Sequence, residues 1–391
     1  MADREDPLLA ALARLSLRAP RRLFVAGLLV MIGTAVFGVP VAARLSAGGL
    51  TDPGAQSSQA AQVLAERFGQ GDMPLLITVS APGGINSPAA REVGTQIVQA
   101  LKASPMVATV TSPWTAPPPA AAPLISKDGT IGVIVAGITG GENGAPKNAD
   151  TLINQVVHDR DGVSVHAGGE SVLKLQITQQ SQKDLKIMEG VAIPLSFLIL
   201  VWVFGGLVAA ALPVAVGIVA ILGALAALHG ISLFTDVSVF ALNLCVAMGM
   251  ALAVDYTLLI LSRFREEIAD GRSREKALTT TMATAGRTVL FSAVTVALCM
   301  ATMVLFPQYF LKSFAYAGAA VVAFAAGAAL IVTPAAITLL GRRLDALDVR
   351  PAMRRLLWGV QGVPRTWEGL SWYRWTRFVI RHAVPIGIAV T

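Results

Sequence analysis

Six runs of mostly apolar residues, each close to the length of a membrane-spanning helix, constrain this chain more than any other feature. They cover residues 23–43, 187–204, 207–227, 237–261, 288–305 and 314–340. A bilayer core takes about 20 residues of helix, and the backbone groups inside it must be satisfied within the protein. The composition agrees, because 54% of the residues are hydrophobic and only 14% are charged. We therefore expect an α-helical polytopic membrane protein.

The basic residues predict how these helices are oriented. Of the 31 Lys and Arg residues, 20 lie in segments 1–22, 263–287 and 341–381, which share one side if the six runs alternate. Basic residues collect in cytoplasmic loops, so we expect residues 1–22 to be a cytoplasmic N-terminus before the first transmembrane helix, residues 23–43. This clustering accounts for the net charge of +7 without nucleic acid, which is not expected as a partner.

Residues 44–186 are predicted to form a water-soluble domain on the extracytoplasmic side. The pattern favours strands at 75–80, 107–112, 131–138 and 163–166, and helices at 87–104 and 148–160. This β-α-β-β-α-β order is typical of a ferredoxin-like antiparallel sheet with two helices on one face. Ser87 and Asn148 are the expected helix caps. Gly140, Gly141 and Gly144 are interpreted as a turn, because no Lys-Ser/Thr pair follows them as in a phosphate-binding loop.

Transmembrane helices two to six are expected within residues 187–340. Gly205 and Gly206 leave almost no loop between the second and third, which predicts a tight antiparallel hairpin. Asp236, ahead of the fourth helix, is interpreted as a cap. Residues 341–377 are expected to be a basic cytoplasmic linker, and residues 378–391 the start of a truncated seventh transmembrane helix.

Asp255 is the strongest candidate functional residue. It lies inside the apolar run 237–261, is followed by Tyr256, and has no basic neighbour before Arg263. A carboxyl group in mid-bilayer costs roughly 2.5–3.5 kcal/mol on insertion scales, so such residues usually face a bundle interior or a water path and carry ions or protons. We expect Asp255 to bind and release protons, with Tyr256 as its hydrogen-bond partner or that of a neighbour. The alternatives are that Asp255 is a hydrogen-bonded packing residue and that Tyr256 only packs the interior.

The fifth apolar run carries small polar residues on one helical face. They recur at steps of four, three, four and three: Thr288, Ser292, Thr295, Cys299 and Thr302. Taken alone, each of these small residues could simply allow close packing between helices. Together, beside an intramembrane carboxyl, they could instead hold water or relay hydrogen bonds to Asp255.

A family resemblance rests on three stretches of the chain. Gly249-Met-Ala-Leu-Ala-Val-Asp255-Tyr256, continued by Ser262-Arg-Phe-Arg-Glu-Glu267, resembles the fourth-helix signature of the mycobacterial membrane protein large (MmpL) branch of the resistance–nodulation–division (RND) transporters. Thr284-Ala-Gly-Arg-Thr-Val-Leu-Phe-Ser-Ala293 and Phe306-Pro-Gln-Tyr-Phe-Leu-Lys-Ser313 are similar to that branch's fifth helix and the loop after it.

The resemblance implies a proton-driven exporter of lipids or other hydrophobic molecules in the inner membrane of an actinobacterium. Such proteins have two similar halves, each with a porter domain, and the Asp-Tyr pair acts with an equivalent pair in the second half. By motif match, the proton relay is Asp255 and Tyr256, with Ser292 on the facing fifth helix. The polar stripe adds Thr288 and Thr295 as residues that would line it. The expected partners are a lipid or hydrophobic substrate, the membrane, and a second half from the same chain or another polypeptide. Homo-oligomerisation stays open.

No enzyme activity, cofactor or metal site is expected. Cys245 and Cys299 both lie in apolar runs, so neither a disulfide framework nor a Cys-based metal site is indicated. Intramembrane aspartyl proteases resemble one another through Gly-x-Gly-Asp and a second mid-span Asp, whereas here Leu252 and Val254 occupy the glycine positions. The remaining alternative is a non-transporting lipid sensor or scaffold built on the same bundle.

Overall fold

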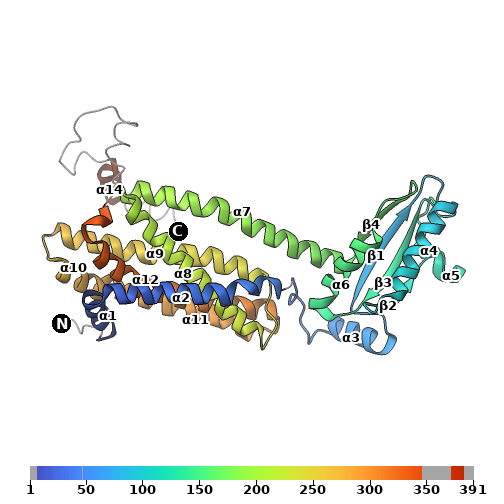
Figure 1. Ribbon diagram of the computed structural model, residues 1–391, viewed down its shortest axis with the longest axis horizontal. Helices are drawn as coiled ribbons and strands as arrows, with labels where there is room; N and C mark the ends of the chain where they lie inside the picture. Colours follow the sequence, from blue (N-terminus) through green and yellow to red (C-terminus); the bar gives the residue numbers. More distant parts are fainter. Residues whose placement is uncertain (1–6, 46, 346–370, 383–391) are drawn as a thin grey trace.

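The protein consists of a helical bundle and an inserted domain that projects from one end of it (Figure 1). The computed structural model describes residues 7–45, 47–345 and 371–382. Within these residues, six helices are long and apolar enough to cross a membrane, which confirms the expected helical membrane protein. We call the bundle end that faces the inserted domain the near end, and the end with Gly205 and Gly206 the far end.

The six spans follow the order of the apolar runs. They are α2 (Pro20–Gly38, extended by a 3-10 turn, Val39–Ala43), α7 (Glu170–Phe204), α8 (Leu207–Ser232), α9 (Phe240–Ala269), the unit of α10 (Arg274–Thr281), a π-helical turn (Met282–Gly286) and α11 (Arg287–Ala301), and α12 (Tyr309–Leu340). Gly205 ends α7 in the left-handed region, at φ +73°, and α8 begins at Leu207. The predicted tight hairpin between the second and third spans is therefore confirmed.

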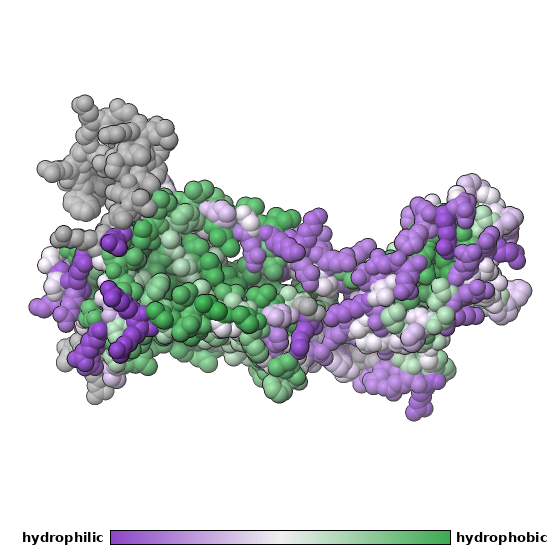
Figure 2. Space-filling view, in the orientation of Figure 1, coloured by the Kyte–Doolittle hydropathy of each residue, from purple (hydrophilic) through white to green (hydrophobic). Residues whose placement is uncertain are grey.

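Helix α12 lies at the centre of the bundle, where it packs against α2, α8, α9 and α11. In its most apolar window 67% of the residues are buried, against 11% for α2, so α12 has protein rather than lipid on most sides. Small residues permit this packing, because Ala317, Ala325 and Ala329 are fully buried. The outer surface of the bundle is largely apolar, with hydrophilic surface at both ends (Figure 2).

The inserted domain is a four-stranded antiparallel sheet with the order β2-β3-β1-β4. Its elements are β1 (Met73–Ser80), α4 (Pro88–Ala103), β2 (Val107–Thr111), β3 (Ile131–Ile138), α6 (Gly141–Val156) and β4 (Ser164–Gly168). Leu75, Ile77 and Val79 alternate into a core that they share with α4 and α6. The ferredoxin-like β-α-β-β-α-β order is confirmed, as is the cap of α4, where the Ser87 hydroxyl accepts from the Ala90 N–H at 3.3 Å.

The expected start of the second domain helix is wrong. Helix α6 begins at Gly141, seven residues before Asn148, because the Asp72 Oδ2 atom accepts from the Gly140 and Gly141 N–H groups at 2.8 Å each. Asn148 therefore lies inside the helix and donates to the Thr139 carbonyl at 2.7 Å. Asp236 is not a cap either, since Val239 precedes α9 and no side chain caps it.

Further helices extend or add to the predicted elements. Helix α7 starts at Glu170, so its polar first half continues the second span out to the inserted domain. Helices α1 (Pro7–Arg18) and α3 (Gln56–Phe68) were not predicted, since neither is an apolar run. Helix α14 (Ser371–Arg381) crosses the expected boundary between linker and seventh helix at residue 378. Residues 346–370 and 383–391, which hold the rest of both predicted segments, lie outside the described residues.

We predict that close packing of α8 against α12 limits what residue 223 can be. A Cβ atom at Gly223 would lie 2.2 Å from the Phe324 ring, whereas one at Gly327 meets nothing within 4 Å. Gly223→Ala should therefore destabilise the bundle by about 1–3 kcal/mol through overpacking. Gly327→Ala, the matched control, should be neutral or slightly stabilising. Thermal unfolding in detergent tests this, and equal melting temperatures for the two variants would contradict it.

Candidate functional site

Helix α9 presents Asp255 on the outside of the bundle formed by this chain. Its neighbours Ala253, Tyr256 and Thr257 are buried, while Asp255 is exposed. Residues three or four apart share a helical face, and α8 and α12 cover the opposite face of α9. The six described spans thus do not enclose the carboxyl group. It faces a groove instead.

This groove has a volume of about 400 Å³ and runs between α9 and α11. Its lining brings the adjacent Asp255 and Tyr256 of α9 together with Thr288 and Ser292 of α11. The rest of the lining is Leu252, Leu258, Leu259, Ser262 and Val289. Thr295, expected in the same site, is exposed on α11 and does not line the groove. The described chain thus combines one carboxyl and four hydroxyl groups with an otherwise apolar wall.

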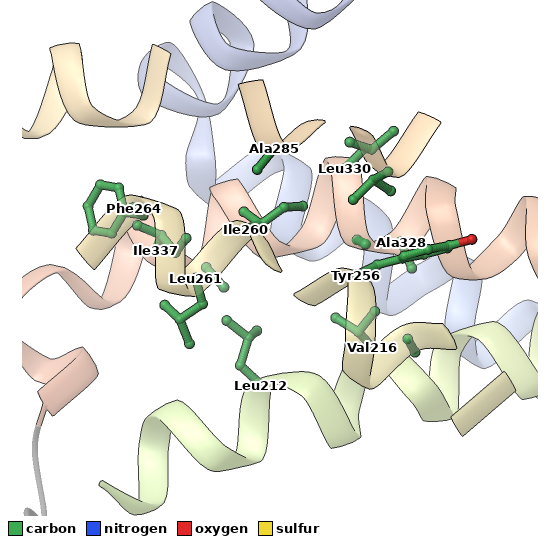
Figure 3. Close-up of a cluster of buried hydrophobic side chains, with 14 of the residues drawn as sticks. Leu212, Val216, Tyr256, Ile260, Leu261, Phe264, Ala285, Ala328, Leu330 and Ile337 are labelled. Carbon is green, nitrogen blue, oxygen red and sulfur yellow. The ribbon is translucent and has the colours of Figure 1, made fainter. Parts of the chain in front are cut away.

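Tyr256 reaches the groove from inside the bundle. Only 4% of its surface is exposed, and its ring lies near Val216 of α8 and Ala328 of α12 (Figure 3). Its hydroxyl is buried and has no hydrogen-bond partner among the described residues. A buried polar group without a partner costs about 1–3 kcal/mol, so the hydroxyl can gain from a water or a further side chain. Tyr256 therefore does not bond Asp255 in this arrangement.

The hydroxyl groups of the α11 stripe separate into two kinds. Thr288, Thr295 and Thr302 each donate to a carbonyl of their own helix, at 3.3, 2.9 and 2.7 Å. Such bonds satisfy a hydroxyl without a partner from another helix, which fits the packing interpretation. Ser292 is half-buried at the groove and makes no such bond within the described chain. Ser292 is thus the stripe residue best placed to hydrogen-bond with water beside Asp255.

The far end of α9 holds a second carboxyl in a different setting. Glu267 is 1% exposed and lies between two arginines, with Oε1 2.6 Å from Arg263 Nη2 and Oε2 2.8 Å from Arg272 Nη1. Removing one partner of such a buried pair is strongly destabilising because it leaves an uncompensated charge. Glu267 therefore fixes the end of α9 to the turn before α10. Asp255 has no ion-pair partner among the described residues.

The fold and the groove define a multi-pass membrane protein with an intramembrane carboxyl group. The MMPL family model matches residues 49–385. The chain therefore belongs to the MMPL family.

Relatives of known name support this assignment. The trehalose monomycolate exporter MmpL3 of Mycobacterium tuberculosis is 33% identical over 339 residues, covering 85% of this chain and 36% of MmpL3. The mycolic acid-containing lipids exporter MmpL11 of Mycolicibacterium smegmatis is 28% identical over 380 residues, covering 94% of this chain and 38% of MmpL11. A membrane protein of Streptomyces coelicolor is 35% identical over 384 residues, covering 97% of this chain and 51% of that protein. The chain thus spans about half or less of these relatives.

A solved structure shares the fold. The crystal structure of a heavy metal efflux pump superposes with a TM-score of 0.58 at 14% sequence identity, covering 86% of this chain and 51% of the pump. At this identity the likeness concerns the fold alone.

The contrast between Ser292 and Thr295 gives a matched test of the groove. If the Ser292 hydroxyl holds water beside Asp255, Ser292→Ala should slow export by the complete transporter up to about tenfold, which corresponds to one hydrogen bond of about 1–1.5 kcal/mol. Thr295→Val removes a hydroxyl outside the groove and should leave the rate near that of the unmodified protein. Rates per folded protein molecule decide the matter, and equal rates for both variants would assign the whole stripe to packing.

Proposed function

We propose that this chain forms one half of a proton-driven exporter of lipids or other hydrophobic molecules, with Asp255 as the proton carrier. The observation that carries the proposal is an intramembrane carboxyl facing a groove that hydroxyl groups also line. Two relatives, MmpL3 and MmpL11, are lipid exporters by name, which supports a lipid substrate. The second half, from this polypeptide or another, would cover the groove.

The chemistry follows from the cost of charge in apolar surroundings. A protonated Asp255 is neutral and tolerates a dry, closed groove, whereas the carboxylate requires water or hydrogen-bond donors. The Tyr256 hydroxyl and Ser292 can supply donors from the two walls. Proton entry and exit would thus alternate between a hydrated and a closed groove, and this alternation would drive the helices. A ligand or proton moves such an equilibrium only by binding its two states differently.

The proposed location is the inner (plasma) membrane of a bacterium, with the N-terminus in the cytoplasm. The far end of the bundle then lies in the cytoplasm, and the inserted domain is the extracytoplasmic porter domain. The clustered basic residues of segments 1–22 and 263–287 support this orientation.

The proton-carrier proposal predicts a selective loss in Asp255→Asn. The amide keeps the size and hydrogen bonding of the carboxyl but cannot titrate, so proton-dependent export of a fluorescent trehalose monoester by the complete transporter should fall to background. Folded yield should hold or rise, because the cost of an intramembrane charge is removed. Asp270→Asn is the matched control, since Asp270 is exposed just after α9 and outside the groove. Export retained in Asp255→Asn would exclude Asp255 as the carrier.

The proposed orientation predicts which side of the membrane each exposed lysine faces. Lys102 ends α4 of the inserted domain and Lys276 lies on α10 at the far end, and both are exposed. In a Cys299→Ser background, because Cys299 is exposed, a membrane-impermeant maleimide added outside should modify Lys102→Cys and spare Lys276→Cys. Labelling of Lys276→Cys alone in intact cells would reverse the topology.

A further inference from the structure

The inserted domain contacts the near end of the bundle through the first turn of α6. Glu142 Oε1 accepts from the Gly49 N–H at 3.0 Å and from Lys174 Nζ at 3.0 Å. The Gly49 carbonyl in turn accepts from the Phe310 N–H of α12 at 3.2 Å. Gly48 permits this approach, since a Cβ atom there would lie 1.9 Å from the Tyr309 hydroxyl. The chain after α2 is thus held between α6 and α12.

Asn143, the next residue of that turn, bridges two connections of the bundle. Its Nδ2 donates to Asp236 Oδ1 at 2.6 Å, in the connection between α8 and α9. The Tyr309 hydroxyl, at the start of α12, donates to Asn143 Oδ1 at 3.3 Å. One amide therefore joins the inserted domain to the entrances of two transmembrane helices.

These two entrances are tied to each other. The Ser238 N–H donates to the Ser313 hydroxyl at 3.0 Å, and that hydroxyl donates to the Tyr309 carbonyl at 2.6 Å. Helices α9 and α12 also pack along their length. A displacement of α9, which carries Asp255, thus moves Asp236 and Tyr309 together.

The α6 turn is equally well fixed to the inserted domain. Asp72 binds the N–H groups of Gly140 and Gly141, and Asn148 binds the Thr139 carbonyl at the end of β3. Ala145, Ala149 and Leu152 of α6 are buried against the domain. The α6 turn is therefore held to the sheet, and Asn143 lies between the inserted domain and the bundle.

We propose that Asn143 is a positioning residue that couples the α9–α12 pair to the inserted domain. When the protonation state of Asp255 shifts α9, the Asn143 bridge carries the shift to α6 and the sheet. This coupling role rests on the proposed function, in which the protonation state of Asp255 changes. Sequence reasoning missed this bridge, because long stretches of chain separate Asn143, Asp236 and Tyr309 and no motif links them.

The bridge can be broken and rebuilt by exchanging donor and acceptor. Asn143→Asp places two carboxylates at hydrogen-bond distance, where they repel each other. Adding Asp236→Asn restores an amide-to-carboxylate hydrogen bond in the reverse sense, and the Tyr309 hydroxyl can still donate to the new carboxylate. Asn154→Asp, on an exposed part of α6, controls for the added charge.

The readout is the distance between spin labels on Lys102→Cys and Leu233→Cys, in the Cys299→Ser background and in phospholipid nanodiscs. Both positions are exposed, in α4 and at the end of α8. With the bridge intact, Asp255→Asn should shift the distance distribution. In Asn143→Asp the distance distribution should broaden, and the shift caused by Asp255→Asn should disappear. The double exchange Asn143→Asp with Asp236→Asn should restore the narrow distribution and the shift. Asn154→Asp should leave the width and the shift unchanged.

Three results would overturn the proposal. One is an unchanged distribution in Asn143→Asp, and another is a double exchange that folds in normal yield but restores nothing. The third is an intact bridge that shows no shift on Asp255→Asn. If Asp255→Asn abolishes export yet leaves the distance unchanged, the proton-carrier role stands and the coupling role of Asn143 fails. If Asp255→Asn shifts the distance yet permits export, the proton-carrier role of Asp255 fails and the coupling role of Asn143 stands.

Discussion

A carboxyl group inside the membrane cannot be left against lipid without cost, and the rest of this structure depends on how that constraint is met. Helix α9 directs Tyr256 and Ala253 into the bundle and Asp255 out of it. The central position of α12 makes this orientation of α9 possible. The buried small residues of α12 let α8 and α9 pack closely against it, on the side of α9 opposite Asp255. In the part of the chain that the structure describes, the Asp255 carboxyl therefore faces the groove between α9 and α11, which hydroxyl groups also line.

Two carboxyl groups on the same helix show how surroundings decide their roles. Glu267 is buried between Arg263 and Arg272 and serves as a fixed ion pair at the far end. Asp255, three turns earlier, faces an apolar wall with hydroxyl groups and is free of such pairing in the described chain. Only a carboxyl without a permanent counter-charge can change its protonation state at low cost. At the near end, Asn143 of α6 hydrogen-bonds to Asp236 before α9 and to Tyr309 at the start of α12, so the inserted domain contacts both helices.

The sequence was sufficient where the physical signal is local. Apolar runs predicted six spans, the order of strands and helices predicted an antiparallel sheet, and Ser87 predicted a cap. It failed where distant residues act: Asp72 starts α6 ahead of Asn148, and Asp236 binds Asn143 instead of capping α9. Helices α1 and α3 have no long apolar run to reveal them. Among the site residues, spacing placed Ser292 and Thr295 on one face, but only packing shows that the groove ends before Thr295.

We expect further protein, not lipid, to cover the Asp255 face. A photoreactive amino acid at Ala251, exposed one turn before Asp255 on α9, tests this most directly in the complete transporter in its native membrane. The same probe at Leu198, exposed on the outside of α7, reports on lipid. We expect a protein crosslink from Ala251 and lipid adducts from Leu198. Lipid adducts alone from both positions would contradict it.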